Sequence, residues 1–205
     1  MKTNEPICLK VVLIGTTGVG KKTIAIQFTE RKFDLNTSCS ISANRSSKIV
    51  EFKEMNQSIK FDIYDTRGQE KFRPLAKLFY KDAQAVVFVY NITSQCSFDE
   101  IKEYWYKEVK ANAEGNPIFA VVANKIDLYM EQRVRDEDGE TFADEIGAIF
   151  QTTSAKSGSG IDQLFDEIGK TYLSSRLGYK KIEKENKGIK LDVKKTGEKK
   201  KKKCA

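Results

Sequence analysis

Apolar and polar positions follow one another in blocks along this chain of 205 residues, and the spacing of the blocks predicts its elements. Short apolar runs rich in β-branched residues predict buried strands at residues 7–14, 85–90, 118–123 and 149–152. Two further runs predict a hairpin that turns at residues 54–57, with strands at 48–53 and 58–64. We therefore expect six strands.

Helical spacing of apolar residues predicts helices among these strands, at residues 23–32, 97–113, 136–146 and 161–174. Residues 36–40 are too polar to be buried and are expected to form a surface loop. Strands that alternate with helices favour an α/β fold, with a mostly parallel six-stranded sheet flanked by helices. In such a sheet, ligands bind in the loops at the carboxyl ends of the strands.

The charge of the chain is concentrated beyond residue 179, where the apolar periodicity stops. Residues 180–203 hold 12 Lys against 4 acidic residues, a net charge of +8, whereas residues 1–179 hold 24 basic and 25 acidic residues, a net charge of −1. We expect one domain over residues 1–179 and a disordered polybasic tail over residues 180–205. The net charge of +7 therefore does not by itself indicate a nucleic-acid-binding domain.

Composition excludes several kinds of chemistry. The chain has no histidine, which rules out a Ser/His or Cys/His nucleophilic triad and His-ligated zinc. Its four cysteines are scattered without the paired spacing of a metal site. No apolar run approaches the roughly 20 residues that span a bilayer, and no secretory signal pattern is present, so we expect a cytoplasmic protein.

A glycine-rich segment between the first strand and the first helix has the spacing G-x-x-x-x-G-K, over residues 15–21. This spacing predicts a P-loop, in which backbone amides and the helix N-terminus face a polyphosphate and Lys21 adds a full positive charge. The alternative is a glycine-rich turn without a ligand. The candidate phosphate-binding residues are Thr17, Gly18, Val19, Gly20, Lys21, Lys22 and Thr23.

Lys22 departs from the P-loop pattern. A Ser or Thr normally follows the P-loop lysine, because its hydroxyl coordinates Mg²⁺. The Lys22 ammonium has no lone pair to offer a metal ion and repels a dication. The hydroxyl of Thr23 is a poor substitute, since one residue further along a helix is a rotation of about 100°. Mg²⁺ binding at this P-loop is therefore uncertain.

Two further segments, Asn124-Lys125-Ile126-Asp127 and Ser154-Ala155-Lys156, resemble the guanine-recognition motifs of Ras-like small GTPases. The Asp127 carboxylate can accept hydrogen bonds from the N1–H and 2-amino groups of guanine, a donor pattern that adenine lacks. The resemblance implies that the bound ligand is GTP or GDP. It also implies the set of residues around the base: Phe33, Asn124, Lys125, Asp127, Ser154, Ala155 and Lys156.

The resemblance extends over about residues 7–174, and segments 60–66, 79–83 and 89–93 are similar to those of Rab proteins. It implies the P-loop small GTPase fold and a molecular switch that regulates vesicle traffic. The partners implied are guanine nucleotide and effector, exchange-factor and activating proteins, with no specific nucleic acid. The implied location is the cytosolic face of endomembranes. The amino-acid sequence around residues 83–85 is similar to that of endosomal Rabs.

Both switch motifs depart from the family pattern. Residues 65–70 resemble D-T-A-G-Q-E with Arg67 in place of alanine, and residues 40–45 resemble the first switch with Ser40, Ser42 and Arg45 in place of Thr, Gly and Phe. The resemblance implies that Gln69 orients the attacking water. The amides of Ser40 and Gly68 would bond the γ-phosphate, and Ser40 and Asp65 would lie by the metal.

Lys22 and Arg67 together bring two positive charges to the place where the metal ion would sit, which suggests that they replace part of its charge. Nucleotide binding would then depend little on Mg²⁺, and hydrolysis would be slow. Arg67 could act as an arginine finger or obstruct the switch, and we favour obstruction. The alternatives are a pseudo-GTPase scaffold without useful turnover and, more distantly, a polybasic nucleic-acid binder.

An effector surface is expected from Ile41, Phe61, Tyr64 and Phe79, although Phe61 could equally be a core residue. Arg45 is expected to alter the choice of partner.

In the tail, five lysines precede Cys204, which we expect to be geranylgeranylated. One lipid and a lysine cluster are together sufficient signals for an anionic membrane. A solvated tail is the alternative.

Overall fold

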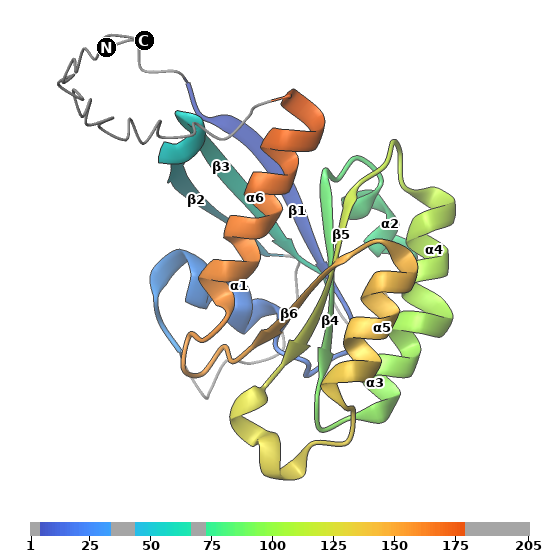
Figure 1. Ribbon diagram of the computed structural model, residues 1–205. Coiled ribbons are helices and arrows are strands. Elements are labelled where there is room, and N and C mark those ends of the chain that lie inside the picture. Colours follow the sequence, from blue (N-terminus) through green and yellow to red (C-terminus); the bar gives the residue numbers. More distant parts are fainter. Residues whose placement is uncertain (1–4, 34–43, 67–72, 179–205) are drawn as a thin grey trace, which may run out of the picture.

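The computed structural model describes residues 5–33, 44–66 and 73–178, which form a six-stranded sheet with helices on both faces (Figure 1). The strands are β1 (Ile7–Ile14), β2 (Asn44–Phe52), β3 (Gln57–Asp65), β4 (Ala85–Asn91), β5 (Ile118–Asn124) and β6 (Ile149–Thr153). The α-helices are α1 (Lys21–Glu30), α2 (Arg73–Tyr80), α3 (Gln95–Glu100), α4 (Tyr106–Asn112), α5 (Asp136–Ile146) and α6 (Ile161–Leu177). Short turns of other helix types are η1 (Lys53–Met55), η3 (Ile101–Trp105) and η4 (Ile126–Glu131).

The strand order is β2-β3-β1-β4-β5-β6, and every neighbouring pair is parallel except the antiparallel hairpin of β2 and β3. The predicted fold class is confirmed. This order places the carboxyl ends of β1, β4, β5 and β6 along one edge, where the loops that carry the candidate motifs begin. No described helix is long and apolar enough to cross a membrane.

Alternate residues of the central strands face two separate cores. In β1, Leu9, Val11 and Leu13 belong to the core under α1 and α6, whereas Val12 and Ile14 belong to the core under α2 to α5. All five side chains are fully buried, as expected for a parallel strand that is covered on both faces. The sheet therefore forms a rigid support for the loops at its edge.

Several elements differ from the sequence-based predictions. Helix α2 was not predicted. The helix expected at residues 97–113 starts at Gln95, and its middle, η3, is a π-helical stretch that divides it into α3 and α4. Strand β2 begins at Asn44, four residues before the predicted start, because an edge strand tolerates exposed polar side chains such as Ser47. The surface loop expected at residues 36–40 lies outside the described residues.

Helix α5 approaches the sheet closely at Gly139. A Cβ atom at this position would lie 2.3 Å from the hydroxyl oxygen of Tyr90 and 2.7 Å from the ring of Phe150. The Tyr90 hydroxyl is buried and has no hydrogen-bond partner among the described residues. The absence of a side chain at residue 139 therefore sets the distance between α5 and the sheet.

Candidate functional site

Asn124 connects the three segments predicted to form the site. It is the last residue of β5 and pairs in register with Thr153 of β6. Its buried amide donates through Nδ2 to the Val19 carbonyl oxygen at 2.8 Å, while its Oδ1 accepts from Thr153 Oγ1 at 3.0 Å and from the Ala155 amide at 3.3 Å. The glycine-rich loop and the two base-recognition motifs therefore meet at one buried side chain.

The glycine-rich loop needs its glycines for two reasons. Gly15, Gly18 and Gly20 have φ angles of 148°, 83° and 99°, which L side chains rarely adopt. A Cβ atom at Gly15 would lie 2.1 Å from the Val89 carbonyl oxygen, and one at Gly20 would lie 2.4 Å from Asn124 Nδ2. The loop therefore packs against the sheet too closely for any other residue at these two positions.

Lys21, the first residue of α1, is almost fully buried. Its ammonium donates to the carbonyl oxygens of Gly15 and Thr16, both at 2.8 Å. These bonds fold the side chain back over the loop and hold a full positive charge beside the first turn of α1. Positive charge and a helix N-terminus together favour an anion.

Asp65 ends β3 beside this charge and is buried. Burial raises the pKa of the Asp65 carboxyl to about 6, against the opposing effect of the charges of Lys21 and Lys22. The two ammonium groups of the first helical turn therefore act on one buried carboxylate. The next residue, Thr66, donates through Oγ1 to the Leu13 carbonyl oxygen at 2.8 Å, which holds the end of β3 against β1.

The described residues do not fit Mg²⁺ as those of an ordinary P-loop do. Lys22, at the position of the usual hydroxyl ligand, is a half-buried ammonium group, and Thr23 is the next residue of the helix. The described part of the chain also contains no group of three or more acidic, Cys or His residues that could hold a metal ion. Among the described residues, Asp65 supplies a carboxylate at this end of the site.

The predicted base-recognition residues lie at the other end of the site. Lys125 has a left-handed conformation, with φ 68°, and directs the chain from β5 into η4. Asp127 is exposed, and its Oδ1 accepts a hydrogen bond of 2.6 Å from the buried Ser154 hydroxyl. Ala155 is buried, whereas Lys156 is exposed. The carboxylate is therefore oriented by a neighbouring motif while it stays accessible to a ligand.

Some predicted site residues are not part of this cluster. Phe33 has an exposed fraction of 38% and makes no hydrogen bond or ring contact with the other predicted site residues among those that the structure describes. Ser40, Ile41, Arg67, Gly68, Gln69 and Cys204 lie outside the described residues. Sequence reasoning missed Thr153 and Thr66, whose hydroxyls hold the strand ends. The available signal was a threonine directly before or within each motif at the end of an apolar run.

The expected effector surface is corrected at one position. Phe61 is fully buried and packs edge-on against the rings of Phe28 and Phe165, so the alternative core reading is the right one. Tyr64 and Phe79 are half-buried, with ring centroids 6.1 Å apart.

Arg45 forms an ion pair next to Tyr64, one of the residues of the expected effector surface. Its guanidinium lies 5.9 Å from the Tyr64 ring centroid and donates to Asp62 Oδ2 at 2.8 Å. An ion pair therefore stands beside Tyr64 and Phe79.

Comparisons with known proteins agree with this arrangement. The Ras family model matches residues 10–174. The chain is 41% identical over 162 residues to human Ras-related protein Rab-22A and 42% identical over 162 residues to mouse Ras-related protein Rab-31, in each case 79% of this chain and 82% of the relative. It is 35% identical over 167 residues to Dictyostelium discoideum Ras-related protein RabJ, which covers 82% of this chain and 64% of that protein. The chain therefore belongs to the Ras family and, within it, to the Rab proteins, which are GTP-binding molecular switches of vesicle traffic.

Proposed function

We propose that this Rab protein binds GTP and GDP at the site centred on Asn124, with the base at Asp127 and the phosphates at residues 17–23. The hydrogen bonds of Asn124 carry this proposal, because they hold the phosphate loop and the base motifs in one rigid unit. The exposed Asp127 carboxylate, oriented by Ser154, accepts from guanine N1–H and the 2-amino group. The stems of Lys125 and Lys156 pack along the base, and Phe33 stands edge-on to it.

We infer that Lys22 supplies part of the charge that Mg²⁺ provides in other members of the family. Two features support this: the ammonium occupies the position of the hydroxyl ligand, and its charge acts on the buried Asp65 carboxylate. A lysine beside the phosphates contributes one positive charge without a metal. Arg67 adds a second positive charge. Nucleotide affinity should therefore change little when divalent ions are removed.

Slow hydrolysis also follows from the presence of Lys22 in place of the usual Ser or Thr. Gln69 would orient the attacking water, but a fixed ammonium cannot bridge two phosphate oxygens with the coordination geometry of a metal ion. The alternative is a pseudo-GTPase scaffold that binds nucleotide weakly or without turnover.

Single-turnover GTP hydrolysis in Mg²⁺ tests both readings: slow but measurable turnover by the natural chain supports the switch, and no turnover supports the scaffold. We expect the Lys22→Ser/Arg67→Ala variant to hydrolyse GTP at least ten times faster than the natural chain. Equal, ordinary rates in both proteins would contradict slow hydrolysis and the pseudo-GTPase reading alike.

The nucleotide state would be read by effector proteins at Tyr64 and Phe79, next to the Arg45–Asp62 ion pair. Rabs of the usual pattern present an aromatic side chain at residue 45, so partners of this chain must accommodate a guanidinium. We propose effector, exchange-factor and activating proteins as its partners, and no specific nucleic acid. An Arg45→Phe variant should bind its native effector less tightly than the natural chain does.

We propose that residues 1–179 are the switch domain and that residues 180–205 attach it to the cytosolic face of endomembranes. Cys204 carries a prenyl group in this proposal, and the preceding lysines contribute on the order of 1 kcal/mol each near an anionic surface. Mass analysis of protein purified from its native cell tests the modification. An unmodified Cys204 would leave only weak, salt-sensitive attachment.

The experiment that tests the central proposal is calorimetry of the full chain with GDP, GTP and ADP, each with and without a chelator. We expect guanine nucleotides to bind at least 100-fold more tightly than ADP, and the chelator to change the GDP affinity less than 10-fold. The Lys22→Ser variant is the matched control and should lose much more affinity on chelation. No binding of GDP or GTP at millimolar concentration would overturn the switch, and a large loss on chelation would overturn the role of Lys22.

A further inference from the structure

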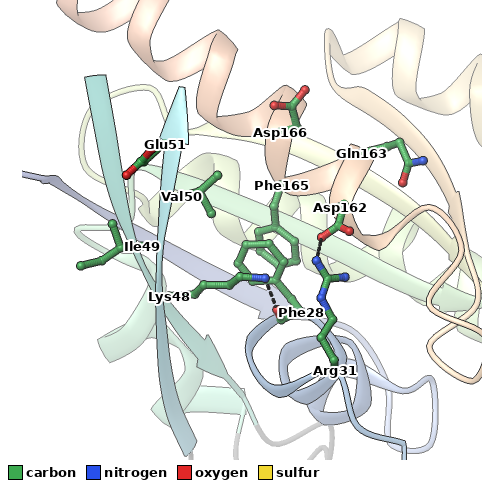
Figure 2. Close-up of a pocket in the computed structure, with 10 residues that line it drawn as sticks. All are labelled: Phe28, Arg31, Lys48, Ile49, Val50, Glu51, Asp162, Gln163, Phe165 and Asp166. Atoms are coloured by element: carbon green, nitrogen blue, oxygen red, sulfur yellow. Dashed lines mark hydrogen bonds and ion pairs between the residues drawn. The ribbon is translucent and has the colours of Figure 1, made fainter. Parts of the chain in front are cut away.

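A groove of about 580 Å³, lined by none of the residues of the Asn124 cluster, lies between the edge strand β2 and the helices α1 and α6 (Figure 2). Residues of β2 form one wall, the C-terminal half of α1 the floor and the N-terminal half of α6 the other wall. Phe28 and Phe165 stack beneath it, with ring centroids 3.8 Å apart. An adjoining hollow of about 240 Å³ continues along α6 and shares Glu51 and Asp166 with the groove.

The cations in the groove already have partners. Lys48 donates to the Phe28 carbonyl oxygen at 2.7 Å and lies 4.4 Å from the Phe28 ring centroid, and Arg31 pairs with Asp162 at 2.7 Å. Burial, and then the charge of Arg31, lower the pKa of Lys48. Of the acidic side chains on the rim, Asp162 is paired with Arg31, and Asp166 pairs with Lys170 at 2.6 Å. A further cation-rich ligand would therefore be received by Glu51, which is exposed.

The backbone of β2 is open on this side. β2 is the first strand of the sheet, and no other strand of the described residues pairs with its outer edge. Ile49 in this edge has an exposed fraction of 57%. An unpaired edge with an exposed apolar residue is a template for one more strand.

The polybasic tail contains a segment with the period of a strand. In residues 189–194, Ile189, Leu191 and Val193 alternate with polar residues, two of which are lysines. A period of two predicts a strand with one apolar face. This alternation is the exception within a tail that is otherwise dominated by lysine.

The tail is long enough to reach the groove. Helix α6 is capped by Gly178, whose left-handed conformation, with φ 66°, ends the helix. At about 1.5 Å per residue, Phe165 lies roughly 20 Å back along the helix from this point. Residues 179–188 span at most about 33 Å when extended, which is sufficient for the return.

The direction in which the tail would run back along α6 also fits an additional strand beside β2. A Cβ atom at Gly169 of α6 would lie 2.2 Å from the ring of Phe52, whereas Asp162 and Lys48 line the groove nearer the start of both elements. β2 and α6 therefore run the same way, and a chain that returns from the end of α6 runs antiparallel to β2.

We propose that residues 189–193 of the tail pair with the outer edge of β2 as an additional antiparallel strand, with their apolar side chains over the groove. Because alternate side chains of a strand point to opposite faces, Lys190 and Lys194 then point away from the groove, to the face on which Glu51 lies (Figure 2). A tail held in this way withdraws those lysines from an anionic membrane, so binding to the membrane and binding to the groove compete. The contact does not involve the Asn124 cluster and is tested without nucleotide.

Hydrogen exchange of the full, unlipidated chain at low salt tests the pairing, because outward-facing amides of an edge strand exchange quickly unless a further strand covers them. The tail variant Leu191→Asp/Val193→Asp breaks the apolar face without touching the folded domain. The variant Thr196→Asp/Gly197→Asp is the matched control, since it adds the same charge and keeps the alternation. We expect peptides over residues 45–52 to exchange at least tenfold more slowly in the natural chain and the control than in the tail variant. Equal exchange in all three proteins would overturn the proposal.

Zero-length carbodiimide cross-linking provides a second readout. We expect cross-links from Lys190 or Lys194 to Glu51 within one chain, and their loss in the tail variant. Cross-links only between two chains, or none in the natural chain, would overturn an intramolecular contact. Vesicles that contain phosphatidylserine should abolish both the cross-links and the slow exchange, and persistence of the cross-links on membrane-bound protein would refute the competition.

Discussion

Asn124 Nδ2 donates a hydrogen bond of 2.8 Å to the carbonyl oxygen of Val19, across 105 residues of sequence. The same side chain accepts two further bonds, so its truncation leaves several buried polar groups without partners. Each such group costs about 1–3 kcal/mol. We expect Asn124→Ala to lower the free energy of unfolding by about 2–4 kcal/mol in urea titrations. Asn112→Ala, at a partly exposed helix position, is the control, and an equal loss in both variants would contradict the buried network.

Asp65 should make stability depend on pH. Its pKa in the fold is about 6, above the ordinary value of 3.8, so the folded protein favours the protonated form. Stability therefore decreases as the pH rises from 3.8 to 6 and is constant above that range. In chelator and without nucleotide, Asp65→Asn should gain about 3 kcal/mol of unfolding free energy at pH 7.5 and only about 1 kcal/mol at pH 4.5. A gain that is equal at both pH values would show that the carboxylate is not destabilised by its charge.

Asp127 should decide which base is bound. Asp127→Asn replaces one acceptor oxygen with an amino group that faces the donors of guanine. We expect GDP affinity to fall about 100-fold, measured by calorimetry, because a charge-assisted hydrogen bond is lost and a donor faces a donor. The exposed Asp144→Asn is the control and should bind GDP as the natural chain does. Unchanged affinity in Asp127→Asn would place the base elsewhere.

The stacked pair of Phe28 and Phe165 should be a major contribution to stability. Phe165 is 1% exposed and touches both Phe28 and Phe61. Phe165→Ala should cost about 3–5 kcal/mol of unfolding free energy, the usual range for a buried phenylalanine. Phe33→Ala, at a position with 38% exposure, should cost less than about 1 kcal/mol. Similar losses at the two positions would mean that the core tolerates the cavity.

The strands were the part of the fold that the sequence predicted best. Parallel strands covered on both faces must be apolar throughout, and β4 and β5 have no competing interpretation. The edge strand β2 was predicted too short, because its first residues need not be buried. The π-helical stretch η3 is one residue out of step with a regular helix, and a pattern of apolar residues does not resolve so small a shift.

The candidate site was predicted from its motifs rather than from its contacts. Spacing alone places Lys21 in the phosphate loop, because the loop length is a local property, but the predicted helix began at residue 23, two residues after the observed start of α1 at Lys21. The bonds that Asn124 makes with Val19 and Thr153 depend on the order of the strands in the sheet, which no local pattern encodes. The effect of Lys22 on Asp65 has the same origin, since it arises where α1 begins beside the end of β3.

Gly139 and Tyr90 are in such close contact that we do not expect them to vary independently during evolution. A methyl group on residue 139 would collide with the Tyr90 hydroxyl, and that hydroxyl has no hydrogen-bond partner among the described residues. Loss of the oxygen removes the closest of these contacts, but the Phe150 ring, 2.7 Å from the same Cβ position, must also give way before a better helix former fits. The larger side chain arriving first would push α5 outward. Homologues that carry alanine at residue 139 should therefore carry phenylalanine at residue 90 and a smaller side chain at residue 150, so that the order of these substitutions, and not only their sum, determines which lineages retain a stable fold.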